Sequence, residues 1–568
     1  MKRIIFTTII SLFIATGSFA QTYSGSCGAN LTWTLNNGVL TISGTGAMTN
    51  YSYERIPDIG DVTTAPWGIH TASLQSLVLN EGITHIGDCA FAVCTGLTGS
   101  LTIPNSVISI GDNAFNNCFG FTGNLTIPNS VKTIEAQAFI GCSGFNGGLT
   151  IGNSVETIGH GAFYSCTGFS GNLTIPNSVK TIVEYAFAKC SGFTGNLTIG
   201  NSVKTIEEAT FWECTGFKGN LTIGSAVETI GYGSFRSTSF TGNLTIPNSV
   251  KIIERYAFTD CTGFKGNLTI GNSVKTIEEA AFYGCTGFTG NLTIPNSVVT
   301  IGNNAFTACT GFTGNLTIGS SVKTIGVSAF WDCTGFKGSL TIGAAVETID
   351  EYAFYDCAGF TSIISRAIEP PAAVSNTFGN MNYSIPVHVA PNKVSAYRSA
   401  TGWSRFNYSS FQGSLNTVTF RSNGGSAVPA QAVESGGTID PVISTRPNMT
   451  LEGWYTSEML TNKWIFATDV VNEDMTLYAK WTEGSSSIES ATQLSAGVYS
   501  NADGTFTVDV ANSETFNVTV VNISGQIVKC ETAKGGSHIV NICNQPAGVY
   551  MFVIDNGKQK TTVKVSKR

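Results

Sequence analysis

One phrase of 24 residues returns along most of this chain, and it limits the folds that the chain can adopt. Residues 124–147 read NLTIPNSVKTIEAQAFIGCSGFNG, and closely similar segments start at 148, 172 and 196. A period between 20 and 50 residues is typical of solenoids, in which no unit buries its apolar face until a neighbour stacks on it. The chain has 568 residues, too many for one ordinary core. We therefore predict a mainly β solenoid together with further domains.

The pattern inside each unit predicts which side chains point inward. In the phrase LTI, Leu and Ile alternate with Thr, which is the spacing of a strand with one buried face. The Pro or Gly that follows, and the Asn-Ser pair after it, predict a turn. If successive strands pair in parallel at roughly 4.8 Å, about twelve coils would extend over about 55 Å. The inward positions of the quoted unit are Leu125, Ile127, Val131, Ile134, Ala138, Phe139, Cys142 and Phe145.

The cysteines follow the same period. Eleven of the fifteen recur at one phase, with one longer gap in which Thr238 takes the place. A secreted, cysteine-rich chain suggests disulfides, but one cysteine per unit at a fixed phase predicts a small, buried, reduced side chain. There is no C-x-x-C for a zinc or thioredoxin-type site. Outside the series, Cys530 and Cys543 can pair with each other. The series comprises Cys94, Cys118, Cys142, Cys166, Cys190, Cys214, Cys261, Cys285, Cys309, Cys333 and Cys357.

The N-terminus has the features of a secretory signal. Lys2 and Arg3 precede an apolar run that begins at Ile4, and small residues flank Phe19 before the expected cleavage after Ala20. No later stretch reaches 18 apolar residues, so we expect no membrane-spanning helix. Charged residues are only 12% of the chain, with a net charge of −7 and no basic patch. This composition argues against a nucleic-acid partner.

The repeat consensus N-S-V-K-T-I-E-x-x-A-F-x-x-C-T-G-F resembles the BspA-type leucine-rich repeat family. The likeness covers about residues 24–412. Residues 24–67 resemble the N-terminal cap of that family, and IPVHVAPNKVSAYRSATGWSRF at 385–406 resembles its closing segment. The family phrase L-x-x-I-x-I is here Phe-x-x-x-Leu-x-Ile, which is one residue longer and leaves the local turn geometry open. The resemblance implies a leucine-rich repeat solenoid of about twelve coils.

Two smaller modules follow the repeats. The segment 415–482, with its SNGG turn and terminal LYAKW, resembles the Listeria–Bacteroides (internalin B-type) repeat, which implies a small β-grasp module. The segment 496–568 contains SGQIV, QPAGVYMFVI and a final KVSKR, and it resembles the C-terminal sorting domain of the type IX secretion system. About six short strands predict a small β-sandwich there. The turn NADG at 501–504 is a weak indication of calcium.

These resemblances imply a division of the chain and a location for it. The sorting domain implies export and attachment outside the outer membrane of a Bacteroidetes-type bacterium. The expected parts are a signal peptide (1–20), an N-terminal cap (21–72), the solenoid with its closing segment (73–412), the β-grasp repeat (415–482), a polar linker (483–495) and the sorting domain (496–568).

The position after the core phenylalanine varies most from unit to unit, and five of its eleven occupants are Tyr or Trp. A row of exposed rings suits stacking on sugar faces or on peptide side chains, because each ring offers a large area at little entropic loss. Alternatively, the rings lie along the coil edge and cover the neighbouring phenylalanine. The candidate binding residues are Tyr164, Trp212, Tyr283, Trp331 and Tyr355.

A second column is charged. Its lysines are interrupted by three glutamates, and this mixture of signs favours a solvated face over an acidic-partner site. The Thr column of LTI, from Thr102 to Thr341, is expected on the exposed strand face. The charged column comprises Lys132, Lys180, Lys204, Lys251, Lys275 and Lys323, with Glu156, Glu228 and Glu347 between them.

Little in the chain indicates catalysis. The five histidines are scattered, and there is no G-x-S-x-G, H-E-x-x-H or Walker A motif. Glu254 and Glu278 share a phase on successive coils, at a spacing like that of the carboxylate pair in retaining glycosidases. Glu135 and Glu207 have the same phase, so repetition alone explains the pair. We expect no catalytic residue, no metal and no cofactor.

The sequence therefore predicts a cell-surface or secreted binding protein of the adhesin type. Its expected partner is a protein of the host matrix or of a partner cell. Two alternatives stay open: a glycan-binding protein for nutrient capture, and a structural coat protein without a specific ligand.

Overall fold

The computed structural model describes residues 22–56, 60–407, 411–413, 415–483, 496–501, 505–522, 527–542, 545, 548–555 and 560–567. The expected signal peptide and nearly all of the expected linker lie outside these residues. So do Cys543, with its predicted pairing to Cys530, and most of the NADG turn. The described residues form two compact units, one within 22–422, 427–443 and 454–478, and one within 423–426, 444–453 and 479–567.

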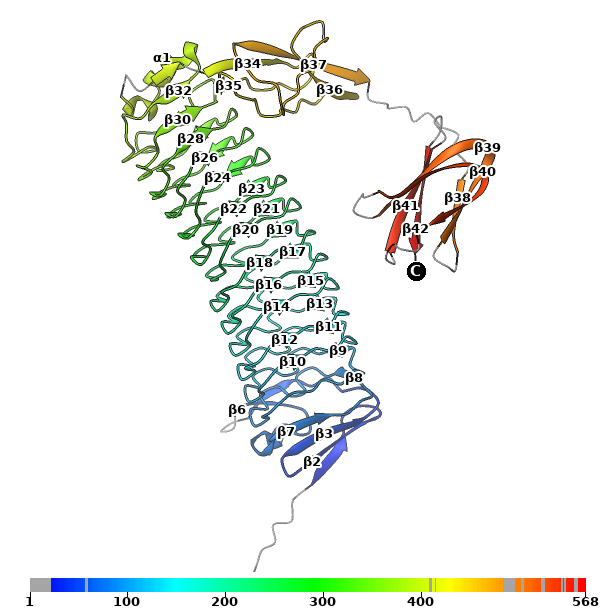
Figure 1. Cartoon of the computed structure of the whole chain (residues 1–568). Coiled ribbons are helices and arrows are strands. Elements are labelled where there is room, and N and C mark those ends of the chain that lie inside the picture. Colours follow the sequence, from blue (N-terminus) through cyan, green and yellow to red (C-terminus); the bar gives the residue numbers. More distant parts are fainter. Residues whose placement is uncertain are drawn as a thin grey trace, which may run out of the picture. The chain divides into compact units, whose positions relative to one another are not determined.

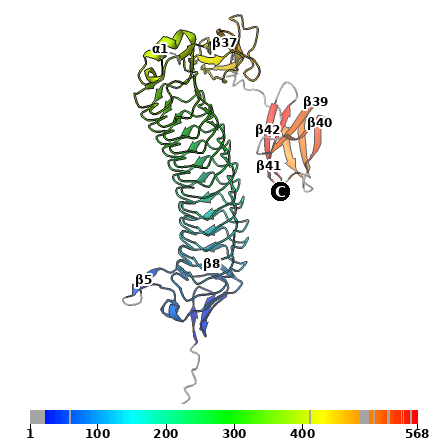
Figure 2. The ribbon, with the colours of Figure 1, turned by 60° about the vertical axis from the view of Figure 1, so that its left-hand side comes forward.

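The repeats form a solenoid in which most coils contribute two very short strands, whereas the coil that begins at Leu101 contributes only the strand Ser109–Ile110 (Figures 1 and 2). The strands of successive coils pair in parallel and in register, so that Thr133 and Ile134 lie opposite Thr157 and Ile158. The predicted mainly β solenoid is confirmed. The strand expected at LTI is present as a pair of residues, and a second strand at the phase of Thr133 was not predicted.

The first ladder continues through nearly all coils, in two sheets. It contains β4 (Gly46–Ala47), β8 (Ile83–Ile86), β9 (Ser109–Ile110), β11 (Thr133–Ile134), β13 (Thr157–Ile158), β15 (Thr181–Ile182), β17 (Thr205–Ile206), β19 (Thr229–Ile230), β21 (Ile252–Ile253), β23 (Thr276–Ile277), β25 (Thr300–Ile301), β27 (Thr324–Ile325), β29 (Thr348–Ile349) and β31 (Ala372–Ala373).

The second ladder is interrupted into four sheets. It contains β10 (Leu125–Thr126), β12 (Leu149–Thr150), β14 (Leu173–Thr174), β16 (Leu197–Thr198), β18 (Leu221–Thr222), β20 (Leu244–Thr245), β22 (Leu268–Thr269), β24 (Leu292–Thr293), β26 (Leu316–Thr317), β28 (Ser339–Ile342), β30 (Ser362–Ser365), β32 (Val387–Val389) and β33 (Phe411–Gly413). Apart from the buried Thr341, the Thr side chains of this ladder are exposed or half-buried, as expected.

One continuous apolar core fills the solenoid, and two stacks of phenylalanine rings follow its length. In one stack, Phe139 lies 5.2 Å from Phe115 and 5.2 Å from Phe163, with nearly parallel planes. In the other, Phe145 and Phe169 lie 5.3 Å apart. Because each ring packs between identical rings of the coils before and after it, the stability of a coil depends chiefly on its neighbours.

Asparagine side chains join the turns of successive coils. Asn196 Oδ1 accepts a hydrogen bond from the backbone N–H of Asn220 at 2.7 Å, while the N–H of Asn196 donates to Asn172 Oδ1 at 2.8 Å. A second ladder of this kind runs through the Asn-Ser turns, where Asn177 Oδ1 accepts from the N–H of Asn201. The longer connection before LTI contains Gly123 at φ +78°, a conformation that suits glycine.

A tryptophan closes the phenylalanine stack at each end. Trp67 stacks on Phe91 at 5.4 Å and donates Nε1–H to the carbonyl of Ala90. Trp403 lies 4.8 Å from Phe378 and donates to the carbonyl of Pro371. The N-terminal end also contains β1 (Tyr23–Ser26), β2 (Leu31–Asn36), β3 (Val39–Gly44), β5 (Tyr53–Ile56), β6 (Gly60–Thr63), η1 (Gly68–Ser73) and β7 (Ser76–Leu79), and the C-terminal end contains η2 (Pro391–Lys393), α1 (Val394–Ser399) and η3 (Trp403–Arg405).

The segment after the solenoid forms a mixed sheet. Strand β34 (Leu415–Arg421) pairs antiparallel with β35 (Gln431–Glu434) and parallel with β37 (Met475–Glu483). Strand β36 covers Met449–Tyr455. Within the larger unit, Asp440 accepts hydrogen bonds from Arg366 and Asn296, both at 3.3 Å.

The C-terminal residues form five described strands, where about six were predicted. They are β38 (Ala496–Ser500), β39 (Thr505–Asn522), β40 (Ile527–Asn541), β41 (Gly548–Asp555) and β42 (Lys560–Lys567). One edge of the long strand β39 pairs with β40, and its other edge pairs first with β38 and then with β41. Side chains such as Phe506, Phe516 and Phe552 form a core of these C-terminal strands that is separate from the solenoid core.

Candidate functional site

The variable column lies on a part of the coil where the backbone satisfies its own hydrogen bonds. The N–H groups of Gln137, Phe139 and Gly141 donate to carbonyls of the next coil, at 2.7 to 2.8 Å. Those of Ile140 and Cys142 donate three residues back, both at 3.1 Å. This pattern depends on backbone groups alone, so the side chain after the core phenylalanine is free to differ in every coil.

The structure distributes the five candidate aromatics between two environments. Tyr283 and Trp331 are exposed, with 40% and 42% of their residue surface accessible. Tyr164, Trp212 and Tyr355 are half-buried. The five rings therefore do not form one uniform exposed row. Tyr283 and Trp331 fit the alternative of exposed stacking rings, and the three half-buried rings fit the alternative of rings that lie along the coil edge.

A lysine occupies the space between two of the half-buried rings. Lys189 Nζ lies 5.6 Å from the centroid of Tyr164 and 4.9 Å from that of Trp212, and its ammonium lies 4.0 Å from Glu213. The Tyr164 hydroxyl, as a hydrogen-bond partner, raises the pKa of Lys189. Cation–π contacts on both sides, with a carboxylate nearby, hold this ammonium in place.

Near the C-terminal end of the column the rings contact one another. Trp331 lies 6.3 Å from Tyr352 and 6.2 Å from Tyr355, and these two tyrosines lie 5.4 Å apart. The ring of Tyr355 covers Gly379, since a Cβ there would lie 2.3 Å from a ring carbon. The sequence reasoning missed Tyr352, although Tyr185 and Tyr256 occur at the same phase.

The charged column is exposed and its opposite charges pair between adjacent coils. Lys180 donates to Glu156 at 2.6 Å, and Lys323 lies 3.8 Å from Glu347. Lys180 lowers the pKa of Glu156. Exposed pairs of this kind contribute little to stability, because water screens the two charges. The expected solvated face is therefore confirmed.

The carboxylates that share a phase are engaged within the fold. Glu254 Oε2 accepts a hydrogen bond from the N–H of Tyr232 at 2.9 Å, and Glu278 is half-buried. Burial, followed by the charges of Glu184 and Glu254, raises the pKa of Glu207. Within the described parts of the chain, no group of three or more His, Cys, Asp or Glu side chains is placed to hold a metal ion.

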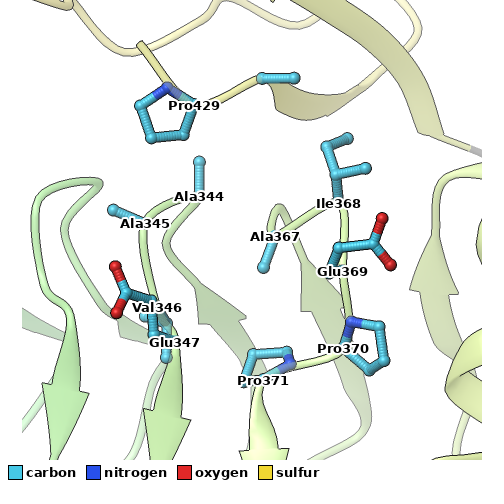
Figure 3. A pocket seen from close by; sticks show the side chains of 11 residues that line it. Ala344, Ala345, Val346, Glu347, Ala367, Ile368, Glu369, Pro370, Pro371 and Pro429 are labelled. Atoms are coloured by element: carbon cyan, nitrogen blue, oxygen red, sulfur yellow. The ribbon is translucent and has the colours of Figure 1, made fainter. Parts of the chain in front are cut away.

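A shallow hollow of about 380 Å³ lies near the last coils (Figure 3). Its walls are mainly apolar, with Ala344, Pro371 and Pro429 among them, and Glu347 and Glu369 supply carboxylates. Glu369 is paired with Lys393. None of the five candidate aromatics lines this hollow.

Three family models match the chain. The BspA type leucine rich repeat region matches residues 69–148, 147–265 and 263–369. The Listeria-Bacteroides repeat domain matches 417–480, and the secretion system C-terminal sorting domain matches 497–568. In the part of the chain that the structure describes, no helix is long and apolar enough to cross a membrane.

Two curated relatives come from Evansella cellulosilytica and are named as a Gly-rich membrane protein and a membrane protein. They are 50% identical over 66 residues and 44% identical over 75 residues, which is 11% and 13% of this chain. The matched segments span only 8% and 11% of the relatives' own length.

Solved structures with a similar course include a leucine-rich repeat protein of Eubacterium ventriosum. It is 22% identical, with 64% of this chain and 95% of that chain covered and a TM-score of 0.34. A leucine rich cell surface protein of Faecalibacterium prausnitzii is 21% identical, with 68% and 98% covered and a TM-score of 0.32.

Proposed function

The chain belongs to the family of proteins with BspA-type leucine-rich repeats, and on that premise we propose that it is an adhesin-like protein whose solenoid binds another protein. It is a secreted, cell-surface protein, since a secretion sorting domain follows repeats of a surface-protein type. Leucine-rich repeat proteins generally mediate protein binding and are typically not enzymes. We assign this chain no catalytic role.

One observation carries this proposal: a constant backbone presents a column of side chains that differ from coil to coil. Two members of the column, Tyr283 and Trp331, are large, aromatic and exposed. Residues of these types dominate the binding energy of protein interfaces, because each buries a large area with few rotatable bonds. Their exposure supports a binding role for this column.

The proposed partner is a protein of the host matrix or of a partner cell. The runner-up is a glycan, since exposed rings also stack on sugar faces. A coat protein without a ligand is the third reading. These three readings predict different outcomes in one binding assay.

The test uses the full mature chain, immobilised and exposed in parallel to matrix proteins, to proteins of partner-cell envelopes and to a glycan array. We expect saturable binding to a protein, and its loss in a variant with Tyr283→Ser and Trp331→Ser. A matched control, Tyr164→Ser with Trp212→Ser, changes the same residue types where Lys189 already covers the rings, and it should bind like the wild type. Binding to glycans alone, with inhibition by free sugar, would favour the runner-up. If the wild-type chain binds neither a protein nor a glycan specifically, the alternative of a coat protein without a ligand remains.

A further inference from the structure

The column contains two triplets of coils with the same aromatic arrangement. In the first, Tyr164 and Trp212 lie two coils apart, and Lys189 from the middle coil lies between their rings. The distances from its ammonium to the two ring centroids, 5.6 and 4.9 Å, together match two coil spacings of roughly 4.8 Å each. Two coil spacings are therefore the right gap for one ammonium group.

The second triplet repeats this arrangement without the lysine. Tyr283 and Trp331 are again two coils apart, and Ala308 stands at the position of Lys189. Both rings are exposed, at 40% and 42%, whereas the rings beside Lys189 are half-buried. The backbone is the same, since Ala308 has φ +58° and Lys189 has φ +60°.

The charges around the second triplet are negative. Asp332 follows Trp331, as Glu213 follows Trp212 in the first triplet. The carboxylate of Asp260 lies close to Gly284: a Cβ at that glycine would be 2.6 Å from Asp260 Oδ1. The carboxylate of Asp356 is one coil further on and accepts a hydrogen bond from Asn380 at 2.8 Å. Carboxylates beside exposed rings complement a cation.

The neighbours of Trp331 also keep its ring in place. Tyr352 and Tyr355, which contact it, come from the following coil, whereas Ala308 comes from the preceding one. The contacts of Trp331 with these tyrosines thus lie toward the C-terminal end of the column.

We propose that the gap between Tyr283 and Trp331, over Ala308, binds a lysine side chain presented by a partner protein, in the way that Lys189 occupies the gap between Tyr164 and Trp212. This inference rests on the proposed protein-binding function and names the chemistry that the column recognises. The ammonium lies between the two rings and is paired with Asp332.

The test measures binding of a small probe to the full chain. The probe is the peptide acetyl-Gly-Lys-Gly-amide, observed by saturation-transfer NMR at its lysine ε-methylene, and its matched control is the same peptide with an acetylated lysine. We expect the lysine peptide to bind the wild type and the acetylated peptide to bind about tenfold more weakly or not at all, since cation–π and charge contacts are lost.

Three variants make the test specific. Ala308→Lys supplies the chain's own lysine and should abolish probe binding, and Trp331→Ala should weaken it about tenfold. Lys189→Ala opens the first gap and should about double the saturation transfer. Ser237→Lys is the matched control: it adds the same charge at the same phase, at φ +58°, and should leave binding unchanged.

Equal binding of both peptides, or undiminished binding to Ala308→Lys, would overturn the inference. If neither peptide binds while the wild type still binds a protein partner, the inference fails and the proposed function stands. Binding of methyl β-galactoside in place of the peptide, lost in Trp331→Ala, would identify the column as a sugar site and also overturn it.

Discussion

At the scale of single residues, the repeated cysteine is a small buried side chain that also forms a hydrogen bond between coils. Cys190 is fully buried, and its thiol donates to the carbonyl of Phe163 in the preceding coil at 3.0 Å. The same contact recurs along the series, for example from Cys142 to Phe115. Where Thr238 replaces the cysteine, its hydroxyl donates to Phe235 of its own coil. The prediction of buried cysteines in the repeats is confirmed, and the thirteen cysteines from Cys27 to Cys357 are free.

These thiols predict a loss of stability at alkaline pH. Burial raises the pKa of Cys142, Cys214 and Cys309 from 9.0 to about 12. The folded state thus holds protons that the unfolded chain releases, so the stabilisation is complete below pH 9.0 and is lost as pH rises toward about 12. Each such thiol contributes to this loss of stability throughout that window. We expect the melting temperature to fall between about pH 9 and 11.

The control for this effect replaces those three cysteines by threonine, as at Thr238. The variant should lose less stability over the same pH interval, because it lacks three of the buried thiols. The titration of tyrosine and lysine is common to both proteins and therefore cancels in the comparison. In the wild type at pH 8, a thiol reagent should label the buried cysteines only after unfolding. Rapid labelling of the native protein, or equal alkaline loss in both proteins, would contradict the account.

At the scale of the coil, stacking explains both the regularity and the stability of the element. Each core phenylalanine contacts its equivalents one coil before and one coil after. Because most of the strands are only two residues long, side-chain stacks and asparagine ladders carry much of the contact between coils. A substitution that destabilises one coil should therefore destabilise the adjacent coils before the more distant ones.

Phe211→Ala tests this local coupling. Phe211 is fully buried and lies 5.5 Å from both Phe187 and Phe235. Removing the ring leaves a cavity and should cost about 3–5 kcal/mol. We expect hydrogen exchange to rise in the coils of Phe187, Phe211 and Phe235 before it rises elsewhere. A uniform rise over residues 73–360 would be inconsistent with a stack of neighbour-dependent coils.

Asn196→Ala tests the ladder in the turns. Its side-chain oxygen accepts from the N–H of Asn220, and the loss of such a bond should cost about 0.5–1.5 kcal/mol. The amide of Asn220 should exchange faster, while the amide of Asn196, whose acceptor Asn172 is intact, should not. Asn196→Asp keeps an acceptor at the same place and should restore protection. If the Asn220 amide exchanges equally fast in Asn196→Ala and Asn196→Asp, the side-chain hydrogen bond of Asn196 is not what protects it.

At the scale of the whole molecule, function depends on parts that fold separately. The solenoid has its own core, and the C-terminal strands have another. The sorting domain accounts for location at the cell surface, and the domain boundaries drawn from the sequence remain our proposal. Binding and export should accordingly be separable.

Deleting residues 496–568 tests that separation. We expect the truncated chain to accumulate in the periplasm, because the matched sorting domain at 497–568 is removed. Protease treatment of intact cells measures surface display, and the purified truncated chain should still bind the protein partner. Internal deletion of residues 484–495, which lie within the expected linker, serves as a control that keeps the sorting domain. Normal display of the truncated chain would refute the assigned role.

The repeat by itself determined most of the fold. A period of 24 residues with constant apolar phases leaves stacking of coils as the way to bury those residues, so core positions such as Phe139 and Cys142 followed directly. The inward and outward phases of each coil, and the solvated lysine column, were predictable for the same reason.

Only the tertiary structure decided which outward residues are accessible. Tyr164 and Tyr283 have the same phase and each follows an Ala-Phe pair, yet Lys189 covers one ring and Ala308 leaves the other exposed. The covering residue comes from the next coil, about 24 positions away, so local sequence pattern carries no signal for it. Exposure of a side chain in a solenoid is set by the coils on either side, and contacts between coils therefore decide where this protein can bind.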